Sequence, residues 1–318
     1  MARKPERLVG LMLVVLVAGS LGCAGPIGRA EGKVPGPSGR ILFVIDTESC
    51  DDCHLTSLDP DGSDPLEYPD LSIGRWSPDG TRIAAIVVME DGRIGTALVD
   101  ADGSNVTSLD IASATLNVAC FAWAPDGGAL LCEGWDDVHP ERLPGLFSVD
   151  VATSDVTRIT SNRSGGHDIP ADYSPDGTQI LFAREDAGRR QRPMALFVAD
   201  PDGTGATRIT PWSSDASGNW SPDGSRIVFT QKGGLRTITP DGTQPHTIPV
   251  NFGEGDAFAY GPGWSPDGGR IVFSLFLERT GQVDLFTVAV DGTDLVQLTD
   301  SPEPDESADW GPAPPLAP

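Results

Sequence analysis

Apolar residues along this chain fall in short runs that are separated by turn-forming residues, and helical periodicity is absent after the first twenty positions. Within a run the apolar residues are consecutive, as in Ile227-Val228-Phe229, which indicates strands covered on both faces. We therefore expect an all-β domain. The clearest strands are 83–88, 129–132, 179–182, 226–229 and 270–273.

Each of these strands follows a repeated phrase of the form Trp-Ser-Pro-Asp-Gly. The five copies occupy residues 76–80, 123–127, 173–177, 220–224 and 264–268. A truncated sixth copy reads Trp310-Gly311-Pro312. The aromatic residues that begin successive copies are 47, 50, 47, 44 and 46 positions apart. Proline presets the turn and glycine supplies its left-handed residue, so each phrase predicts a tight hairpin. A period in this range indicates a repeat architecture.

Each repeat predicts a four-stranded antiparallel meander. A third strand, such as 195–199 or 285–290, ends in a second Asp-Gly turn, and a weaker fourth strand follows, such as 206–210. When such sheets stack as blades around an axis, each sheet has both of its faces covered by its neighbours. This arrangement is the β-propeller architecture.

The first and last strands of the repeat region each lack a partner within their own repeat. The strand from Ile41 to Ile45 has no phrase before it, and the strand from Ser307 to Trp310 has no hairpin after it. Pairing the two would close the ring and remove exposed sheet edges. We expect a six-bladed propeller over residues 40–311, with blades 2 to 6 beginning near Gly74, Ala119, Ala171, Gly218 and Gly263.

The Trp-Ser-Pro-Asp-Gly-x-x-Ile pattern, with a downstream Asp-Gly-Thr-x-x-x-x-Leu-Thr, is similar to the TolB-type propeller repeats, a WD-like family. The resemblance covers residues 40–311 and implies an envelope-associated, protein-binding propeller. It does not extend to the α/β domain that TolB carries ahead of its propeller. Because propellers host many roles, the resemblance favours the fold more strongly than the function.

The first 22 residues have the pattern of a signal peptide. Arg3, Lys4 and Arg7 precede an apolar run that is too short to span a bilayer. Residues 19–23 resemble a bacterial lipoprotein cleavage box, which predicts lipidation of Cys23 and a membrane-anchored protein facing the periplasm or the cell exterior. An ordinary secreted protein is the alternative. Residues 23–39 would form a flexible tether and 312–318 a Pro-rich tail.

The formal net charge of −24 excludes nucleic acid as a partner and limits membrane contact to a lipid anchor. Cys120 and Cys132 should lie opposite each other across the hairpin centred on Asp126, as a disulfide or as two buried thiols. For Cys50 and Cys53 we favour a local disulfide that closes a loop. A redox motif and a zinc site are the alternatives that we do not favour.

One face of the propeller should carry its long loops, including 134–145, 160–169, 184–194, 251–261 and 275–284. Five aspartates precede the aromatic residues at similar distances: Asp70, Asp168, Asp215, Asp256 and Asp305. Together they could ring the mouth of the channel and attract a basic peptide or a cation. Alternatively, each caps its own loop. Trp135 and Trp212 are candidate interface anchors, or fold under their own loops.

We predict no catalytic residues, no metal and no cofactor. The sequence has no Gly-x-Ser-x-Gly elbow, and its four histidines fall in different blades without ligand spacing. The favoured function is a monomeric, non-catalytic module that binds an envelope protein or peptide. The alternatives are a metal-dependent propeller hydrolase or lyase that uses the acidic mouth, and a carbohydrate-binding propeller that uses Trp135 and Trp212.

Overall fold

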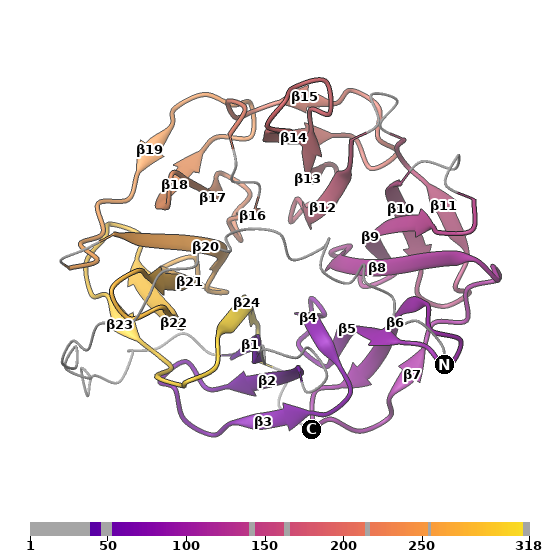
Figure 1. The fold of residues 1–318 in the computed structure, drawn as a ribbon, viewed down its shortest axis with the longest axis horizontal. Helices are drawn as coiled ribbons and strands as arrows, with labels where there is room; N and C mark the ends of the chain where they lie inside the picture. Colours follow the sequence, from indigo (N-terminus) through magenta and orange to yellow (C-terminus); the bar gives the residue numbers. More distant parts are fainter. Residues whose placement is uncertain are drawn as a thin grey trace.

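The chain forms a ring of six sheets around a central axis, and each sheet has four antiparallel strands (Figure 1). This computed structural model describes residues 39–45, 53–139, 144–161, 166–213, 217–253 and 256–313. The predicted six-bladed β-propeller is therefore confirmed. The predictions for residues 1–22, for Cys23 and for most of the tether lie outside the described residues.

Each blade has one strand beside the axis and three strands further out. From the axis outward, blade 1 contains β24 (Asp305–Gly311), β1 (Arg40–Ile45), β2 (His54–Leu58) and β3 (Leu66–Tyr68). In the same order, blade 2 contains β4 (Ser72–Trp76), β5 (Arg82–Val88), β6 (Ile94–Asp100) and β7 (Thr107–Ser108). Blade 3 contains β8 (Leu116–Trp123), β9 (Ala129–Asp136), β10 (Gly145–Asp150) and β11 (Val156–Arg158).

Blade 4 contains β12 (Asp168–Tyr173), β13 (Ile180–Glu185), β14 (Met194–Ala199) and β15 (Thr207–Arg208). Blade 5 contains β16 (Gly218–Trp220), β17 (Ile227–Gln231), β18 (Gly234–Ile238) and β19 (His246–Thr247). Blade 6 contains β20 (Ala257–Trp264), β21 (Arg270–Leu277), β22 (Gln282–Ala289) and β23 (Val296–Gln297).

The last strand closes the ring, as the sequence predicts. Strand β24 lies beside β1 and pairs antiparallel with it (Figure 1). In this pairing Trp310 lies opposite Ile41. Gly311 takes the place that serine has in four of the five complete phrases. A Cβ atom on Gly311 would lie 2.1 Å from the Trp76 ring, so only glycine allows blades 1 and 2 to approach this closely.

The repeated phrase forms nearly the same hairpin five times, with glycine φ angles of 69° to 71°. In the first copy, buried Ser77 donates a hydrogen bond to Asp79 (2.7 Å) and accepts one from the backbone N–H of Arg82 (2.9 Å). The same two contacts recur at Ser174, Ser221 and Ser265, whereas Ala124 replaces this serine in the second copy. The serine therefore fixes the hairpin internally, a role that turn propensity alone does not reveal.

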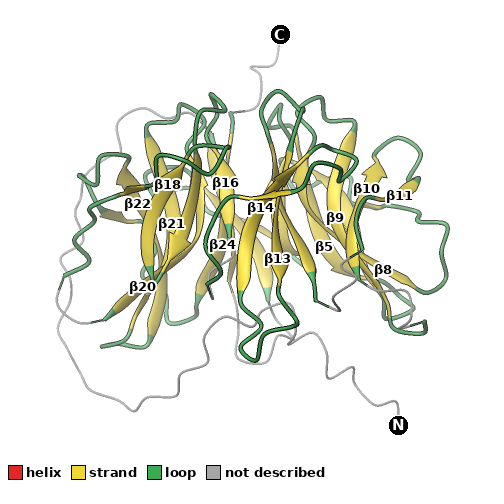
Figure 2. Cartoon of the chain, turned by 90° about the horizontal axis from the view of Figure 1, so that it is seen from above, coloured by secondary structure: helices red, strands yellow, loops and turns green. Residues whose placement is uncertain are grey.

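The strands run between two faces of the ring, as the side view shows (Figure 2). We call the face that carries the Pro-Asp-Gly and Asp-Gly turns the turn face. The opposite face, which carries the loops between the second and third strands and between blades, is the loop face. The loop predicted over 275–284 is shorter than expected, because β21 continues to Leu277 and β22 starts at Gln282.

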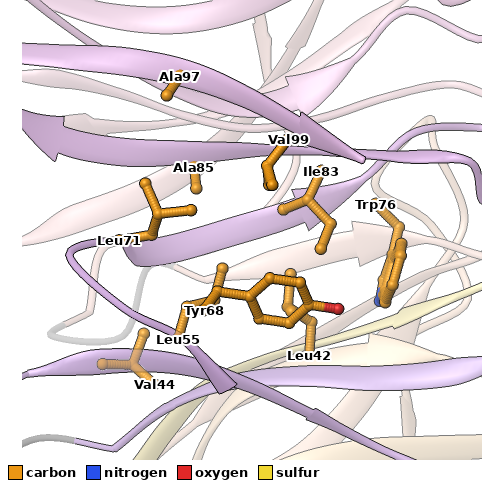
Figure 3. Packing of buried hydrophobic residues seen from close by; sticks show 10 residues of the cluster. All are labelled: Leu42, Val44, Leu55, Tyr68, Leu71, Trp76, Ile83, Ala85, Ala97 and Val99. Carbon is orange, nitrogen blue, oxygen red and sulfur yellow. The ribbon is translucent and has the colours of Figure 1, made fainter. Parts of the chain in front are cut away.

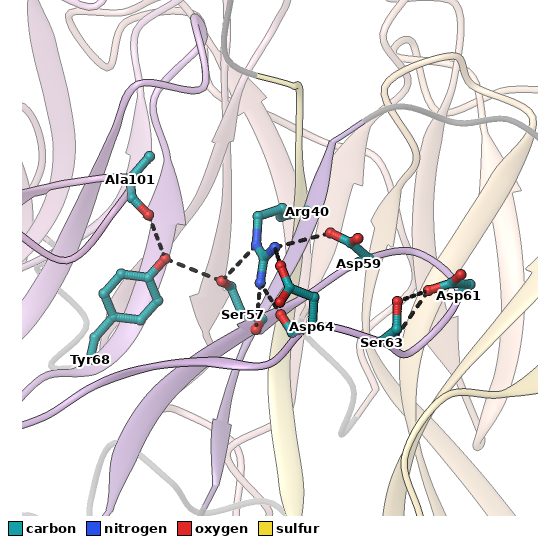
Figure 4. A network of polar contacts seen from close by, with 8 residues as sticks. All are labelled: Arg40, Ser57, Asp59, Asp61, Ser63, Asp64, Tyr68 and Ala101. Atoms are coloured by element: carbon teal, nitrogen blue, oxygen red, sulfur yellow. Dashed lines mark hydrogen bonds and ion pairs between the residues drawn. The ribbon is translucent and has the colours of Figure 1, made fainter.

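The hydrophobic core lies between neighbouring blades rather than at one centre. Between blades 1 and 2, Leu42 and Leu55 pack with Ile83 and Val99 from the next sheet (Figure 3). Polar contacts continue across the same boundary, because the Tyr68 hydroxyl donates to the carbonyl of Ala101 at 2.9 Å (Figure 4). Each blade is thus stabilised mainly by its two neighbours.

Candidate functional site

The six inner strands surround the central channel, and the residue before the aromatic residue of each repeat lies at the same level of the ring. Four of these residues are polar: Arg75, Asp172, Asn219 and Asp309. We call this set the polar collar. All four side chains are partly exposed. The collar places two carboxylates and one guanidinium around the axis.

The collar also joins adjacent blades. The Asp309 carboxylate accepts a hydrogen bond from the backbone N–H of Trp76 (2.7 Å), and Asp172 accepts one from Trp220 (2.8 Å). Where the collar residue is not acidic, the contact changes: the Trp123 indole N–H donates to the carbonyl of Arg75 at 3.0 Å. The indole of Trp264 makes the same contact with Asn219 (3.1 Å). Collar residues therefore hold the blades in register as well as line the channel.

Burial raises the pKa of both collar carboxylates. The pKa of Asp172 is raised to about 7 by desolvation, which outweighs the hydrogen bonds from Trp220 and Tyr173, while Asp309 raises it further and Arg75 lowers it. The pKa of Asp309 is also raised by burial, against the lowering effect of Arg75. Both carboxylates lie deep in the molecule although each has a side open to the channel. Near neutral pH the collar can exchange a proton.

Two of the five aspartates predicted at the channel mouth are buried. Asp168 begins β12 and forms two 2.7 Å hydrogen bonds with Arg184 on the adjacent strand. Asp305 begins β24 and accepts a hydrogen bond from Ser301 (2.8 Å), and burial raises its pKa. Neither carboxyl group is therefore presented to solvent.

The other three mouth aspartates differ from these two. Asp70 and Asp256 are exposed on the loop face, and Asp70 has a positive φ of 63°. Asp215 lies outside the described residues. A buried acid that the sequence did not suggest, Asp284, lies near Asp305, and burial raises its pKa to about 6. The sequence feature that could have indicated burial of Asp284 is its position within an apolar strand.

The two candidate tryptophans differ in their surroundings. Trp135 lies in strand β9, and the following loop begins only after Asp136, so its predicted place in a loop is wrong. The strand continues because β8 offers Asn117 as its pairing partner. Trp212 lies in the connection between blades 4 and 5 and packs 6.0 Å from the Phe197 ring.

The cysteines of blade 3 occupy directly paired positions. Cys120 on β8 lies opposite Cys132 on β9, and a disulfide joins them with a Cα–Cα distance of 3.8 Å. Both are buried in the core between blades 2 and 3. Cys50 lies outside the described residues, so the Cys50–Cys53 bridge stays a prediction.

A buried glutamate pairs with a histidine across blades 3 and 4. The Glu133 side chain on β9 is 1% exposed, and one of its oxygens accepts a hydrogen bond from Nδ1 of His167 at 3.1 Å. Its other oxygen has no hydrogen-bond partner among the described residues. The hydrogen bond that His167 donates to Glu133 raises the pKa of His167 against the opposing effect of burial. Neither residue stands in a recognisable motif.

Within the described ranges, no three histidine, cysteine or acidic side chains are grouped so that they could hold a metal ion. The same ranges contain no helix of the length and apolarity that a membrane span requires.

Comparison with known proteins places this architecture among TolB-like propellers. Residues 37–248 match the family model described as TolB beta propeller domain. The Protein TolB homolog of Chlorobium luteolum is 28% identical over 132 residues, which are 42% of this chain and 27% of that protein. Uncharacterized protein Atu1656 of Agrobacterium fabrum is 29% identical over 136 residues, or 42% of this chain and 41% of that protein.

Among solved structures, TolB from Acinetobacter baumannii superposes with a TM-score of 0.69 at 22% identity, over 87% of this chain and 68% of that chain. Likeness at this identity shows the fold alone. The chain spans less than half the length of the two curated relatives that it matches.

Proposed function

The chain belongs to the family of TolB beta propeller domains, and from this premise we propose that it is a non-catalytic, protein-binding propeller of the cell envelope. The observation that carries the proposal is the distribution of exposed apolar side chains. Val88 is the last residue of β5, beside the loop to β6, Val138 follows β9, and Phe258 lies at the start of β20. They are 60%, 64% and 39% exposed, and all three lie on the loop face.

Three blades therefore each contribute an apolar side chain to one face of the ring. Exposed apolar residues on a framework of rigid strands are typical of protein interfaces, where they become buried on association. Exposed Asp70 and Asp256 add negative charge to the loop face, which favours a partner with a basic segment. The turn face is less suited to binding because its aspartates are occupied by their own turns, as Asp79 is by Ser77 and Thr81.

Site-specific photocrosslinking in the native host tests this proposal. A benzophenone amino acid at Val88, Val138 or Phe258 should yield a discrete crosslinked species, identified by mass spectrometry. The matched controls are Val106 and Val290 on the turn face, which are 55% and 37% exposed. Equal crosslinking from both faces, or none from the loop face, would reject the loop face as the interface.

The envelope location rests on the N-terminal segment as well as on the family. We propose that residues 1–22 are removed and that Cys23 carries the lipid anchor, which would leave the propeller facing the periplasm or the cell exterior. Metabolic labelling with a fatty acid should mark the wild-type protein and not a Cys23→Ala variant. Labelling of that variant would contradict lipidation at this residue.

A further inference from the structure

A cleft on blade 4 has a chemistry unlike the rest of this acidic protein. The loop between β13 and β14 carries Arg189, Arg190 and Gln191, and it faces Trp212 from the connection to blade 5. With Pro193 these residues line an open cleft of about 730 Å³. That volume falls in the range of small-ligand sites, roughly 300–1,000 Å³.

The Trp212 side chain lines this cleft and is contacted by arginines from two elements. The guanidinium carbon of Arg208 on β15 lies 5.4 Å from the ring centroid, and that of Arg189 lies 5.8 Å from it. Phe197 packs against the same indole. The ring and the two cations are thus held in place before any ligand binds, which lowers the entropy cost of binding.

The arginines in the cleft and beside it differ in how their charge is balanced. Arg189 pairs with Asp186 at 2.9 Å, and Arg192 pairs with Glu185. Neither Arg190 nor Arg208 has an acidic partner within the part of the chain that the structure describes. Arg190 in the cleft lining and Arg208 beside the Trp212 ring therefore carry positive charge without an acidic partner, on a chain whose net charge is −24.

We propose that this cleft binds a compact anionic ligand through Arg190 and Arg208, with the body of the ligand against Trp212. Guanidinium groups suit carboxylate and phosphate oxygens because both can be bound in a bidentate manner. The net charge argues for a short ligand, because a long polyanion would extend over the negative surface and be repelled. The shared chemistry is one carboxylate or phosphate group on a small apolar or sugar body.

The test uses the whole propeller and three sugar probes that differ only in the group at carbon 6. Glucuronate supplies a carboxylate, glucose 6-phosphate supplies a phosphate, and glucose supplies neither. The readout is the indole N–H resonance of Trp212 among the seven tryptophans, assigned with a Trp212→Phe variant. We expect saturable shifts with one or both anions at millimolar concentration and no shift with glucose, and the stronger anion distinguishes carboxylate from phosphate.

Charge-neutral variants then locate the contact. Arg190→Gln and Arg208→Gln should each weaken binding of the anion about fivefold, since exposed charge contacts are modest. Arg226→Gln is the matched control because it makes the same charge change at the turn-face end of β17, where Arg226 donates to the carbonyl of Gln244 at 2.7 Å. Equal shifts with glucose and both anions, no shift with any probe, or equal weakening by the control would overturn the proposal.

Discussion

The buried pair of Glu133 and His167 offers a quantitative test of how blades 3 and 4 are joined. Replacing His167 with alanine removes the hydrogen bond to a carboxylate that is 1% exposed. Breaking a fully buried pair costs about 3–5 kcal/mol, because the remaining charge is left uncompensated. His167 is 48% exposed, so water can take part of its place. We therefore expect a loss of about 2 kcal/mol at pH 5.5.

The pH dependence follows from the direction of the histidine shift. Glu133 raises the pKa of His167 above its ordinary value of 6.5. The extra stability is fully present below pH 6.5 and is lost as pH rises through the raised pKa. Glu185 also raises this pKa and Arg192 lowers it, while the backbone N–H of His167 keeps its hydrogen bond to Glu185 in the variant. The coupling between Glu133 and His167 should be smaller at pH 8.5.

A double-mutant cycle isolates this coupling. Urea unfolding, followed by tryptophan fluorescence, would be measured for wild type, His167→Ala, Glu133→Gln and the double variant at pH 5.5 and pH 8.5. In the neutral Glu133→Gln background, His167→Ala should cost less than about 1 kcal/mol. His246→Ala is the control, since His246 is exposed on the outer strand β19. A coupling that is the same at both pH values would refute the electrostatic reasoning.

Three further measurements test other parts of the ring. Replacing both Cys120 and Cys132 with alanine should lower the free energy of unfolding by about 2–3 kcal/mol, since the bridge closes a short loop; an unchanged urea midpoint would contradict this. Ser265→Ala should cost about 1 kcal/mol because the buried N–H of Arg270 loses its acceptor, and a variant as stable as wild type would show that the hairpin does not need the serine. The carboxyl ¹³C resonance of Asp172 should titrate near pH 7, and a midpoint near pH 4 would show that the channel is well solvated at the collar.

The architecture could be predicted from the sequence because local signals agree with the global fold. The Pro-Asp-Gly turns and the consecutive apolar residues recur at one period, and the two strands without partners leave a single way to close the ring. Strand ends were less predictable. Strand β9 runs on to Asp136 through Trp135 because cross-strand pairing with β8 outweighs local composition.

The candidate site was harder to predict because charge balance depends on partners from other elements. Asp168 and Asp70 have similar sequence contexts, yet Asp168 pairs with Arg184 on the next strand and Asp70 is exposed. The distance in sequence from an aromatic residue predicts the level of an aspartate along the channel axis. It does not predict whether a cation such as Arg184 lies next to that aspartate. The cleft at Trp212 is likewise formed by the loop between β13 and β14 and by the connection between blades 4 and 5. Because these segments are separate in the sequence, no local sequence pattern predicts that they meet.

The pairing of β24 with β1 has a consequence for the order of events during synthesis. Ile41 leaves the ribosome about 270 residues before Trp310, its partner in the finished sheet. Until then blade 1 has an open inner edge, and strands with open edges are prone to pair with other chains. A premature stop codon anywhere before the final strand would therefore leave the inner edge of β1 permanently unpaired and prone to aggregation, even if the other blades had formed.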